Sequence, residues 1–162
     1  MNKPLFHIVL LAPEIPNNTG NIGRTAVAAG CVLHLVHPLG FDMDEKARRR
    51  AGLDYWQHLS CIEHASWDEF LATEQPRRLW LYTTRSDRPH WEAEFQRGDY
   101  LLFGNETSGV PQAVHDDVAG HWGEDHRVLL PMQPKARSLN LATAVSAAVY
   151  EGLRTVECRK QC

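Results

Sequence analysis

The sequence lacks any apolar run near the roughly 20 residues that a membrane-spanning helix needs. Its N-terminal segment "LFHIVLL" is about as long as a buried strand and too short for the hydrophobic region of a signal peptide. We therefore expect a cytoplasmic protein with no membrane partner.

Cysteine and histidine patterns typical of redox or metal sites are also missing. The four cysteines, Cys31, Cys61, Cys158 and Cys162, form no CxxC pair, so we expect free thiols in a reducing compartment. The nine histidines are scattered, without an HExxH pattern or a Cys/His cluster. On this basis we predict no metal site.

A surplus of positive charge is absent too. The formal net charge is −3, whereas most stand-alone nucleic-acid-binding domains are basic. A broad nucleic-acid surface is therefore disfavoured, but a local basic patch is not excluded, because salt screens charges beyond about 8 to 10 Å. The length of 162 residues, with 43% hydrophobic and 23% charged residues, is typical of one globular domain.

Short apolar segments alternate with helical ones along the chain. The predicted strands are 5–11, 32–37, 59–64, 78–84, 99–104 and 126–131. The predicted helices are 19–30, 44–52, 66–74, 110–118 and 138–154. This alternation predicts an α/β fold with a mostly parallel sheet and helices on both faces. We expect one domain over residues 1–156, followed by a short polar tail, 157–162.

Several residues signal helix ends. Asn18 or Thr19 could cap the first helix, and Gly30 could supply its left-handed stop. Ser66 and Glu69 have the spacing of a capping box at the start of the helix 66–74.

Four polar segments directly follow predicted strands: 12–24, 82–88, 104–110 and 131–140. In open α/β sheets, ligands bind beyond the carboxyl ends of the strands, so these segments are the candidate site. The first, "PEIPNNTGNIGR", matches neither GxGxxG nor GxxxxGK[ST]. An ordinary helix entry with Arg24 in solvent explains this segment equally well.

The third segment is "LLFGNETSGVP", in which Gly104 and Gly109 would allow a close backbone approach. Glu106 stands between them in a tight loop. A simple strand-to-helix turn, capped by Thr107 or Ser108, is the alternative.

In the fourth segment, Arg137, Ser138 and Asn140 precede a long Ala-rich helix. Unpaired N–H groups at a helix N-terminus favour carboxylates or phosphates. Alternatively, Ser138 could be only a helix cap. The small side chains of the helix would let another backbone pack very close.

Three motifs, taken in order, resemble those of the SPOUT-class (SpoU-type) RNA 2′-O-methyltransferases. They are "NNTGNIGRTAVAAG", "LLFGNETSGVP" and "LPMQPKARSLNLATAVSAAVYE". The connecting "HPLGF", "RRRAGLDYW" and "LYTT" resemble the minimal single-domain subfamily, which acts on the wobble cytidine or uridine of tRNA, nucleotide 34. The resemblance spans about residues 5 to 154. It implies a C-terminal trefoil knot, S-adenosylmethionine as methyl donor, S-adenosylhomocysteine as product and no metal.

The resemblance also implies a cofactor site in the knot. The positions that match the family's cofactor-binding residues are Tyr82, Gly104, Leu130, Met132, Ser138 and Leu139. Three apolar side chains among them, Leu130, Met132 and Leu139, could sandwich the flat adenine ring.

For catalysis, the resemblance assigns Arg24 to the target nucleotide, with Asn18, Glu106, Ser138 and Asn140 around it. A guanidinium with a pKa above about 12 is a poor general base. We therefore expect Arg24 to anchor a phosphate with two hydrogen bonds and to stabilise the developing alkoxide.

RNA contacts are expected from Arg48, Arg49, Arg50, Tyr55 and Arg137. A solvated helix face is the alternative for the three consecutive arginines. Tyr55 and the adjacent Trp56 could stack on a base. We expect the tRNA anticodon stem-loop as substrate and a homodimer built partly on the Ala-rich last helix, with one subunit's Arg24 facing the other's cofactor.

Two positions depart from the wobble subfamily. Asn105 stands where proline is expected, and Ser108 where a basic residue is expected. Asn105 is more typical of rRNA-modifying relatives, so an rRNA 2′-O-methyltransferase is one alternative. A non-catalytic knotted RNA-binding module is another. Without the resemblance, the pattern would suggest a flavodoxin-like nucleotide-binding protein.

Overall fold

The computed structural model describes residues 2–44 and 54–161. The strands are β1 (Phe6–Leu11), β2 (Val32–Val36), β3 (Cys61–His64), β4 (Leu79–Tyr82), β5 (Asp99–Phe103) and β6 (Arg127–Val128). The α-helices are α1 (Pro16–Ala29), α3 (Trp67–Glu74), α4 (Gln112–His121) and α5 (Leu141–Lys160). Three short 3₁₀ helices are η1 (Asp54–His58), η2 (His90–Glu92) and η3 (Glu124–His126). The predicted helix 44–52 lies outside the described residues, apart from Asp44.

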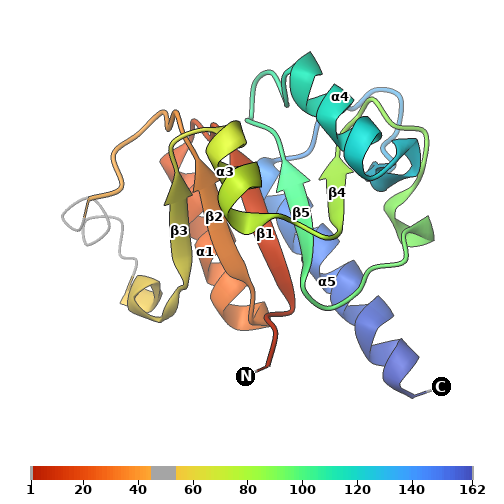
Figure 1. Cartoon of the computed structure of the whole chain (residues 1–162), viewed down its shortest axis with the longest axis horizontal. Helices are drawn as coiled ribbons and strands as arrows, with labels where there is room; N and C mark the ends of the chain where they lie inside the picture. The colour runs from red at the N-terminus through yellow and green to blue at the C-terminus, as the bar shows by residue number, and fades with distance from the viewer. Residues whose placement is uncertain (1, 45–53, 162) are drawn as a thin grey trace.

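The strands form one six-stranded sheet in the order β3-β2-β1-β5-β4-β6. Every pairing in it is parallel. Helices α1 and α5 cover one face, and α3 and α4 cover the other (Figure 1). The predicted α/β fold with a parallel sheet and helices on both faces is therefore confirmed.

The core divides into two layers because successive side chains of a strand point to opposite faces. In the central strand β1, Ile8 and Leu10 pack with Ile22 of α1 and Val145 of α5. The residue between them, Val9, belongs to the second layer with side chains of α3 and α4.

The two helices α1 and α5 approach closely through small side chains. Thr25 Oγ1 and Ser146 Oγ are 2.9 Å apart and share a hydrogen bond across the contact. Further along α5, a Cβ on Gly152 would lie 2.5 Å from the Phe6 ring. The Ala-rich helix therefore packs first against α1 of its own chain.

The start of α1 differs from the prediction. The helix begins at Pro16, and the capping position, Ile15, has no side-chain hydrogen bond. Asn18 and Thr19 are buried within the first turn, so the predicted cap at these residues is wrong. Proline is favoured at the first helical position, which explains the earlier start. Gly30 closes the helix with φ of 72°, as predicted.

The C-terminal elements are also displaced. Strand β6 has two residues instead of six, because beyond it Leu129 makes only an isolated bridge with Pro89. Helix α5 starts three residues later than predicted and continues to Lys160, so residues 157–160 extend the helix rather than form a separate tail.

The predicted cap of α3 is confirmed, since Ser66 Oγ accepts from Glu69 N at 3.1 Å.

Among the described helices, none combines the length and the apolarity needed to cross a bilayer. Cys31 is buried, Cys158 is exposed, and both are free thiols. Burial raises the pKa of the Cys31 thiol to about 11.

Candidate functional site

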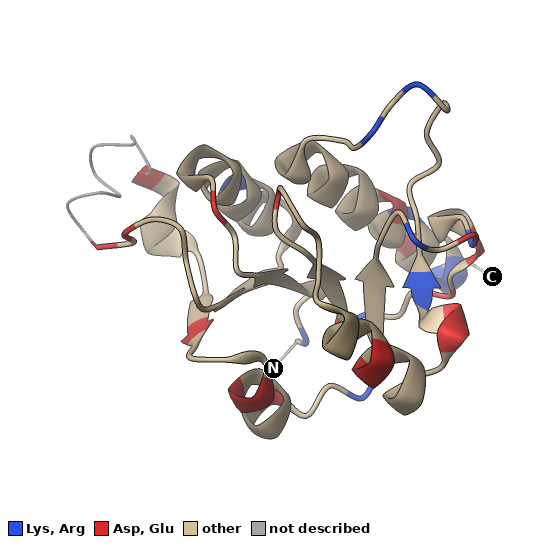
Figure 2. Ribbon diagram, turned by 90° about the horizontal axis from the view of Figure 1, so that it is seen from above, with Lys and Arg blue, Asp and Glu red and all other residues tan. Residues whose placement is uncertain are grey.

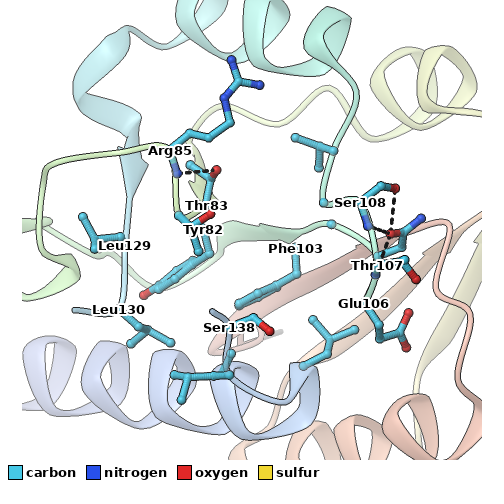
Figure 3. A pocket seen from close by; sticks show the side chains of 18 of the residues that line it. Tyr82, Thr83, Arg85, Phe103, Glu106, Thr107, Ser108, Leu129, Leu130 and Ser138 are labelled. Atoms are coloured by element: carbon cyan, nitrogen blue, oxygen red, sulfur yellow. Dashed lines mark hydrogen bonds between the residues drawn. The ribbon is translucent and has the colours of Figure 1, made fainter. Parts of the chain in front are cut away.

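A cavity of about 540 Å³ opens at the carboxyl ends of β4 and β5 (Figure 3). This volume lies in the range of about 300 to 1,000 Å³ typical of small-molecule sites. The segment after β5 forms one side, and the segment between β6 and α5 forms the other. All six residues predicted to bind a cofactor line it: Tyr82, Gly104, Leu130, Met132, Ser138 and Leu139.

Aromatic rings form the floor of this cavity. The rings of Tyr82 and Phe103 are stacked, with centroids 4.9 Å apart and an interplanar angle of 15°. Figure 3 shows Leu130 at one end and Glu106 at the other, with Ser138 and Phe103 between them. The cavity thus has an apolar end suited to a flat ring and a polar end suited to hydrogen bonding.

The Tyr82 hydroxyl forms a hydrogen bond with a histidine. Tyr82 Oη and His90 Nδ1 are 3.0 Å apart. Burial raises the pKa of Tyr82 and lowers that of His90. The phenol therefore keeps its proton, and its hydrogen bond with the neutral imidazole fixes the orientation of the ring.

The loop after β5 depends on Gly104. A Cβ at this position would lie 2.3 Å from the carbonyl carbon of Gly109, closer than two carbons can approach without a bond. The backbones of Asn105 and Gly109 exchange hydrogen bonds of 3.2 and 3.3 Å. Only a residue without a side chain fits where the two ends of the loop meet.

Asn105 and Ser108, the two residues that depart from the subfamily pattern, shape this same loop. Asn105 Oδ1 accepts from Ser108 N at 2.7 Å, from Thr107 N at 3.1 Å and from the Ser108 hydroxyl at 3.0 Å. The side chain of Asn105 therefore takes the place of a backbone turn.

Two glutamates join this loop to the start of α1. Glu106 accepts from the backbone N–H groups of Glu14 at 2.8 Å and Ile15 at 3.0 Å. In return, the Glu14 carboxylate accepts from Asn105 Nδ2 at 3.3 Å and from Thr107 Oγ1 at 2.5 Å. Each segment thus supplies a carboxylate to the other. Sequence analysis gave Glu14 no role, because its partners lie about 90 residues away.

The environment of Glu106 keeps it ionised. Partial burial acts to raise its pKa, but hydrogen bonds from the backbone and from Asn18 outweigh this effect and lower the pKa below its usual value. An ionised carboxylate that already accepts several hydrogen bonds is a weak proton acceptor. Glu106 is therefore suited to holding the site together.

A chain of amides continues from Glu106 to α5. Asn18 Nδ2 donates to Glu106 Oε1 at 3.3 Å, and Asn18 Oδ1 accepts from Asn140 Nδ2 at 2.9 Å. Asn140 Oδ1 caps α5 by accepting from Thr143 N at 3.1 Å. Asn140, not Ser138, is therefore the N-cap, and Ser138 faces the cavity.

Arg24 lies apart from this group. It is exposed and is not one of the residues that line the cavity. Its guanidinium carbon is 5.2 Å from the centre of the Tyr55 ring, and the Tyr55 hydroxyl donates to Gly20 O. In the described residues of one chain, four of the five predicted catalytic residues gather around the cavity, and Arg24 does not.

The predicted RNA-binding residues are only partly accounted for. Arg48, Arg49 and Arg50 lie outside the described residues. Trp56 is 8% exposed and packs in the core, so the prediction that it stacks on a base is wrong. Arg137 lines the cavity, and Figure 2 shows basic positions on the projecting segment that leads into α5.

Some residues of the cavity were missed by sequence analysis, notably Phe103 and Thr83. Phe103 is the last residue of β5, directly before the loop that begins at Gly104, which is a position that points to a ligand site. Thr83 lies in one of the four segments singled out, but nothing in that segment distinguished it.

Comparison with known proteins gives the family. The model of the SpoU rRNA Methylase family matches residues 5–150. A tRNA (cytidine(34)-2'-O)-methyltransferase of Saccharophagus degradans is 46% identical, over 93% of this chain and 95% of its own. The enzyme of the same name from Escherichia coli strain K12 is 43% identical, over 93% of both chains.

Solved structures that resemble this chain point to the same family. One, described as giving structural insights into the 2-OH methylation of C/U34 on tRNA, has a TM-score of 0.83 and 42% identity over 96% of this chain and 92% of its own. The SpoU methyltransferase AviRb of Streptomyces viridochromogenes, in complex with the cofactor AdoMet, has a TM-score of 0.80 and 25% identity. It covers all of this chain, which spans 63% of AviRb. The chain therefore belongs to the SpoU methylase family.

Proposed function

We propose that this protein methylates the ribose 2′-hydroxyl of the wobble nucleotide of tRNA, cytidine or uridine 34, with S-adenosylmethionine as donor. The observation that carries the proposal is the identity of 43 to 46% to tRNA (cytidine(34)-2'-O)-methyltransferases over nearly the full length of both chains. The cavity described above supplies a place for the cofactor.

The residues of the cavity fit S-adenosylmethionine, which would supply a methyl group on a positively charged sulfur. Leu130, Met132 and Leu139 offer apolar surface to the adenine ring. Backbone groups near Gly104 can approach a ligand because the glycine lacks a side chain. The carboxylate of Glu106 lies at the polar end, where it favours a nearby positive charge.

An rRNA substrate, the first alternative, was suggested by Asn105. The hydrogen bonds of Asn105 to Thr107 and Ser108 offer a reason for this residue that involves no RNA. The identity to enzymes named for tRNA also favours tRNA. The second alternative, a non-catalytic module, is disfavoured by the connected set of Asn18, Glu106 and Asn140 beside the cavity.

Arg24 is proposed to act across a homodimer. In one chain it lies outside the cavity. The Arg24 of a second copy could instead reach the target nucleotide bound at this cavity. Tyr55 and Arg137, with Arg48, Arg49 and Arg50, are proposed to bind the anticodon stem-loop. The trefoil knot and the cytoplasmic location stay predictions.

The test of the reaction is a methyl-transfer assay with labelled S-adenosylmethionine on total tRNA and on total rRNA, followed by nuclease mapping. We expect a 2′-O-methyl group at nucleotide 34 of tRNA. Label in rRNA alone would overturn the tRNA assignment. Cofactor binding without label in either RNA would favour the non-catalytic alternative.

The test of the dimer mixes two inactive variants, Arg24→Ala and a cavity variant such as Leu130→Arg. If Arg24 acts across the interface, half of the randomly mixed dimers contain one complete site, so about one quarter of wild-type activity should return. If Arg24 serves its own chain's cavity, the mixture stays inactive.

A further inference from the structure

Three histidines and a glutamate lie together under α3, on the sheet face opposite α1 and α5. His34 comes from β2 and His64 from the neighbouring β3. Their rings are stacked, with centroids 5.3 Å apart. Glu74 is the last residue of α3, and His7 comes from β1. These residues lie outside the cavity lining, and nothing in the proposed methyl transfer uses them.

Three atoms of this group lie within 3.9 Å of one another. His34 Nδ1 and His64 Nε2 are 3.0 Å apart, and Glu74 Oε1 is 3.9 Å from the first and 3.8 Å from the second. The carboxylate oxygen is too far from both nitrogens for a hydrogen bond. The nearest point equidistant from all three atoms, in their plane, lies about 2.1 Å from each, which is the length of zinc–nitrogen and zinc–oxygen bonds.

We propose that His34, His64 and Glu74 bind a divalent transition-metal ion, with Zn²⁺ as the best-suited ion. Two imidazoles and one carboxylate are ligands that Zn²⁺ takes in proteins, with a fourth position left for water. Water can reach the site beside Glu74, whose side chain is 19% exposed. This site is independent of the proposed methyl transfer.

The outer partners of the three ligands match those of known metal sites. A metal-binding histidine usually donates its second ring N–H to another group, which fixes its orientation. His34 Nε2 lies 2.9 Å from His7 Nδ1, and His64 Nδ1 lies 3.4 Å from Thr73 Oγ1. The other oxygen of Glu74 accepts from the Tyr100 hydroxyl at 3.0 Å. Each of the three ligands thus makes a further hydrogen bond that fixes its orientation.

The three imidazoles neither gain nor lose a proton when the ion binds. Thr73 Oγ1 donates to Glu69 O at 2.8 Å, so it accepts from His64 Nδ1, and His64 Nε2 carries no proton. In the ion-free chain, His34 Nδ1 donates to that nitrogen. For His34 Nδ1 to bind the metal, its proton must move to Nε2, from which it donates to His7. The proton of His7 then occupies Nε2 of its own ring, so each imidazole stays neutral.

The charge around Glu74 also favours a cation. Among the described residues, its ion-pair partners are His34 and His64, and neither carries a charge when its ring is neutral. A bound metal ion would neutralise the negative charge of the Glu74 carboxylate and link the end of α3 to β2 and β3. His7, His34 and Glu74 offer a second combination, with ligand atoms within 4.8 Å of one another, whereas the ligand atoms of His34, His64 and Glu74 lie within 3.9 Å of one another.

The test is titration of the metal-free, untagged protein with Zn²⁺ by calorimetry and with Co²⁺ by visible absorption. We expect one equivalent to bind, with Co²⁺ bands typical of a site with fewer than six ligands, and a higher melting temperature with Zn²⁺. Glu74→Gln keeps an acceptor for Tyr100 and should weaken binding at least about tenfold. His64→Gln should do the same.

The control is His37→Gln. His37 Nε2 and Glu63 Oε2 form an exposed pair 2.7 Å apart, which could bind metal weakly at the surface, and its loss should leave the titration unchanged. Failure of the wild type to bind, or binding unaffected by Glu74→Gln, would overturn the proposal. Because Glu74→Gln changes only a partly exposed side chain, the test does not depend on whether His64→Gln folds.

Discussion

The guanidinium of Arg24 rests over the ring of Tyr55, 5.2 Å from its centre. The Tyr55 hydroxyl donates to the backbone of Gly20, one turn earlier in α1. The Tyr55 side chain therefore contacts both the backbone of α1 and the Arg24 guanidinium, which α1 carries. This contact gives Tyr55 a role in addition to, or in place of, the predicted contact with a base.

We expect Tyr55→Ala to lower the rate of methyl transfer because it releases Arg24. A cation–π contact at an exposed site contributes about 0.5 to 1 kcal/mol, which corresponds to roughly a two- to five-fold change in rate. Tyr55→Phe keeps the ring and should lose less. Single-turnover kinetics on an anticodon stem-loop would measure both, with His58→Ala, in the same 3₁₀ helix, as control. Equal losses for the Phe and Ala variants would contradict a role for the ring.

Asn140 can be tested for two functions separately. Asn140→Ala removes the N-cap of α5, which should cost about 1 kcal/mol, within the usual range of about 0.5 to 2. Asn140→Asp keeps the capping oxygen but loses the amide that donates to Asn18. We expect urea denaturation to show a clear loss for the Ala variant and a smaller one for Asp, whereas methyl transfer falls in both. A fully active Asp variant would show that the Asn18 contact is dispensable.

Glu106 should make stability depend on pH in the acid range. Its pKa in the folded chain is below the usual value of 4.5, so the unfolded chain takes up the proton first as pH falls. The stabilisation is complete above about pH 4.5 and is lost as pH drops through the lower folded pKa. The free energy of unfolding of Glu106→Gln, measured from pH 6 to 3, should depend less steeply on pH. An unchanged slope would exclude Glu106 as a source.

Two glycines make a matched pair of tests. A Cβ on Gly104 would collide with the backbone of Gly109, so Gly104→Ala should distort the loop and abolish S-adenosylmethionine binding. Gly120 lies in α4 with open space around its Cβ position. Gly120→Ala should raise the free energy of unfolding by roughly 0.5 to 1 kcal/mol and leave cofactor binding intact. Calorimetry with the cofactor and thermal melting would measure both variants.

The sequence predicted the architecture well because strong local signals were present. Apolar strands and a terminating Gly30 or a capping Ser66 need only neighbours in sequence to act. The start of α1 was misplaced for a local reason, the proline at its first position, but other errors arose where distant contacts decide the outcome. Beyond β6, Leu129 forms only an isolated bridge with Pro89, which is distant in the sequence, and the burial of Trp56 depends on α1 and the core.

The candidate site shows the same division. The family motifs led to the six cavity residues and to Asn18, Glu106 and Asn140. Spacing gave no sign of the partner of Glu14, and none of the histidine group under α3, because β1, β2 and β3 bring together residues about 30 positions apart. A scan for local metal motifs misses a site whose ligands are each supplied by a different element.

The paired carboxylates of Glu14 and Glu106 have a consequence for how the protein responds to its ligands. They fasten the segment that borders the cofactor cavity to the beginning of the helix that carries Arg24, so neither can shift without breaking bonds in the other. A ligand that displaces one segment must displace both. If cofactor binding changes the affinity for RNA through this link, RNA must change the affinity for the cofactor by the same factor.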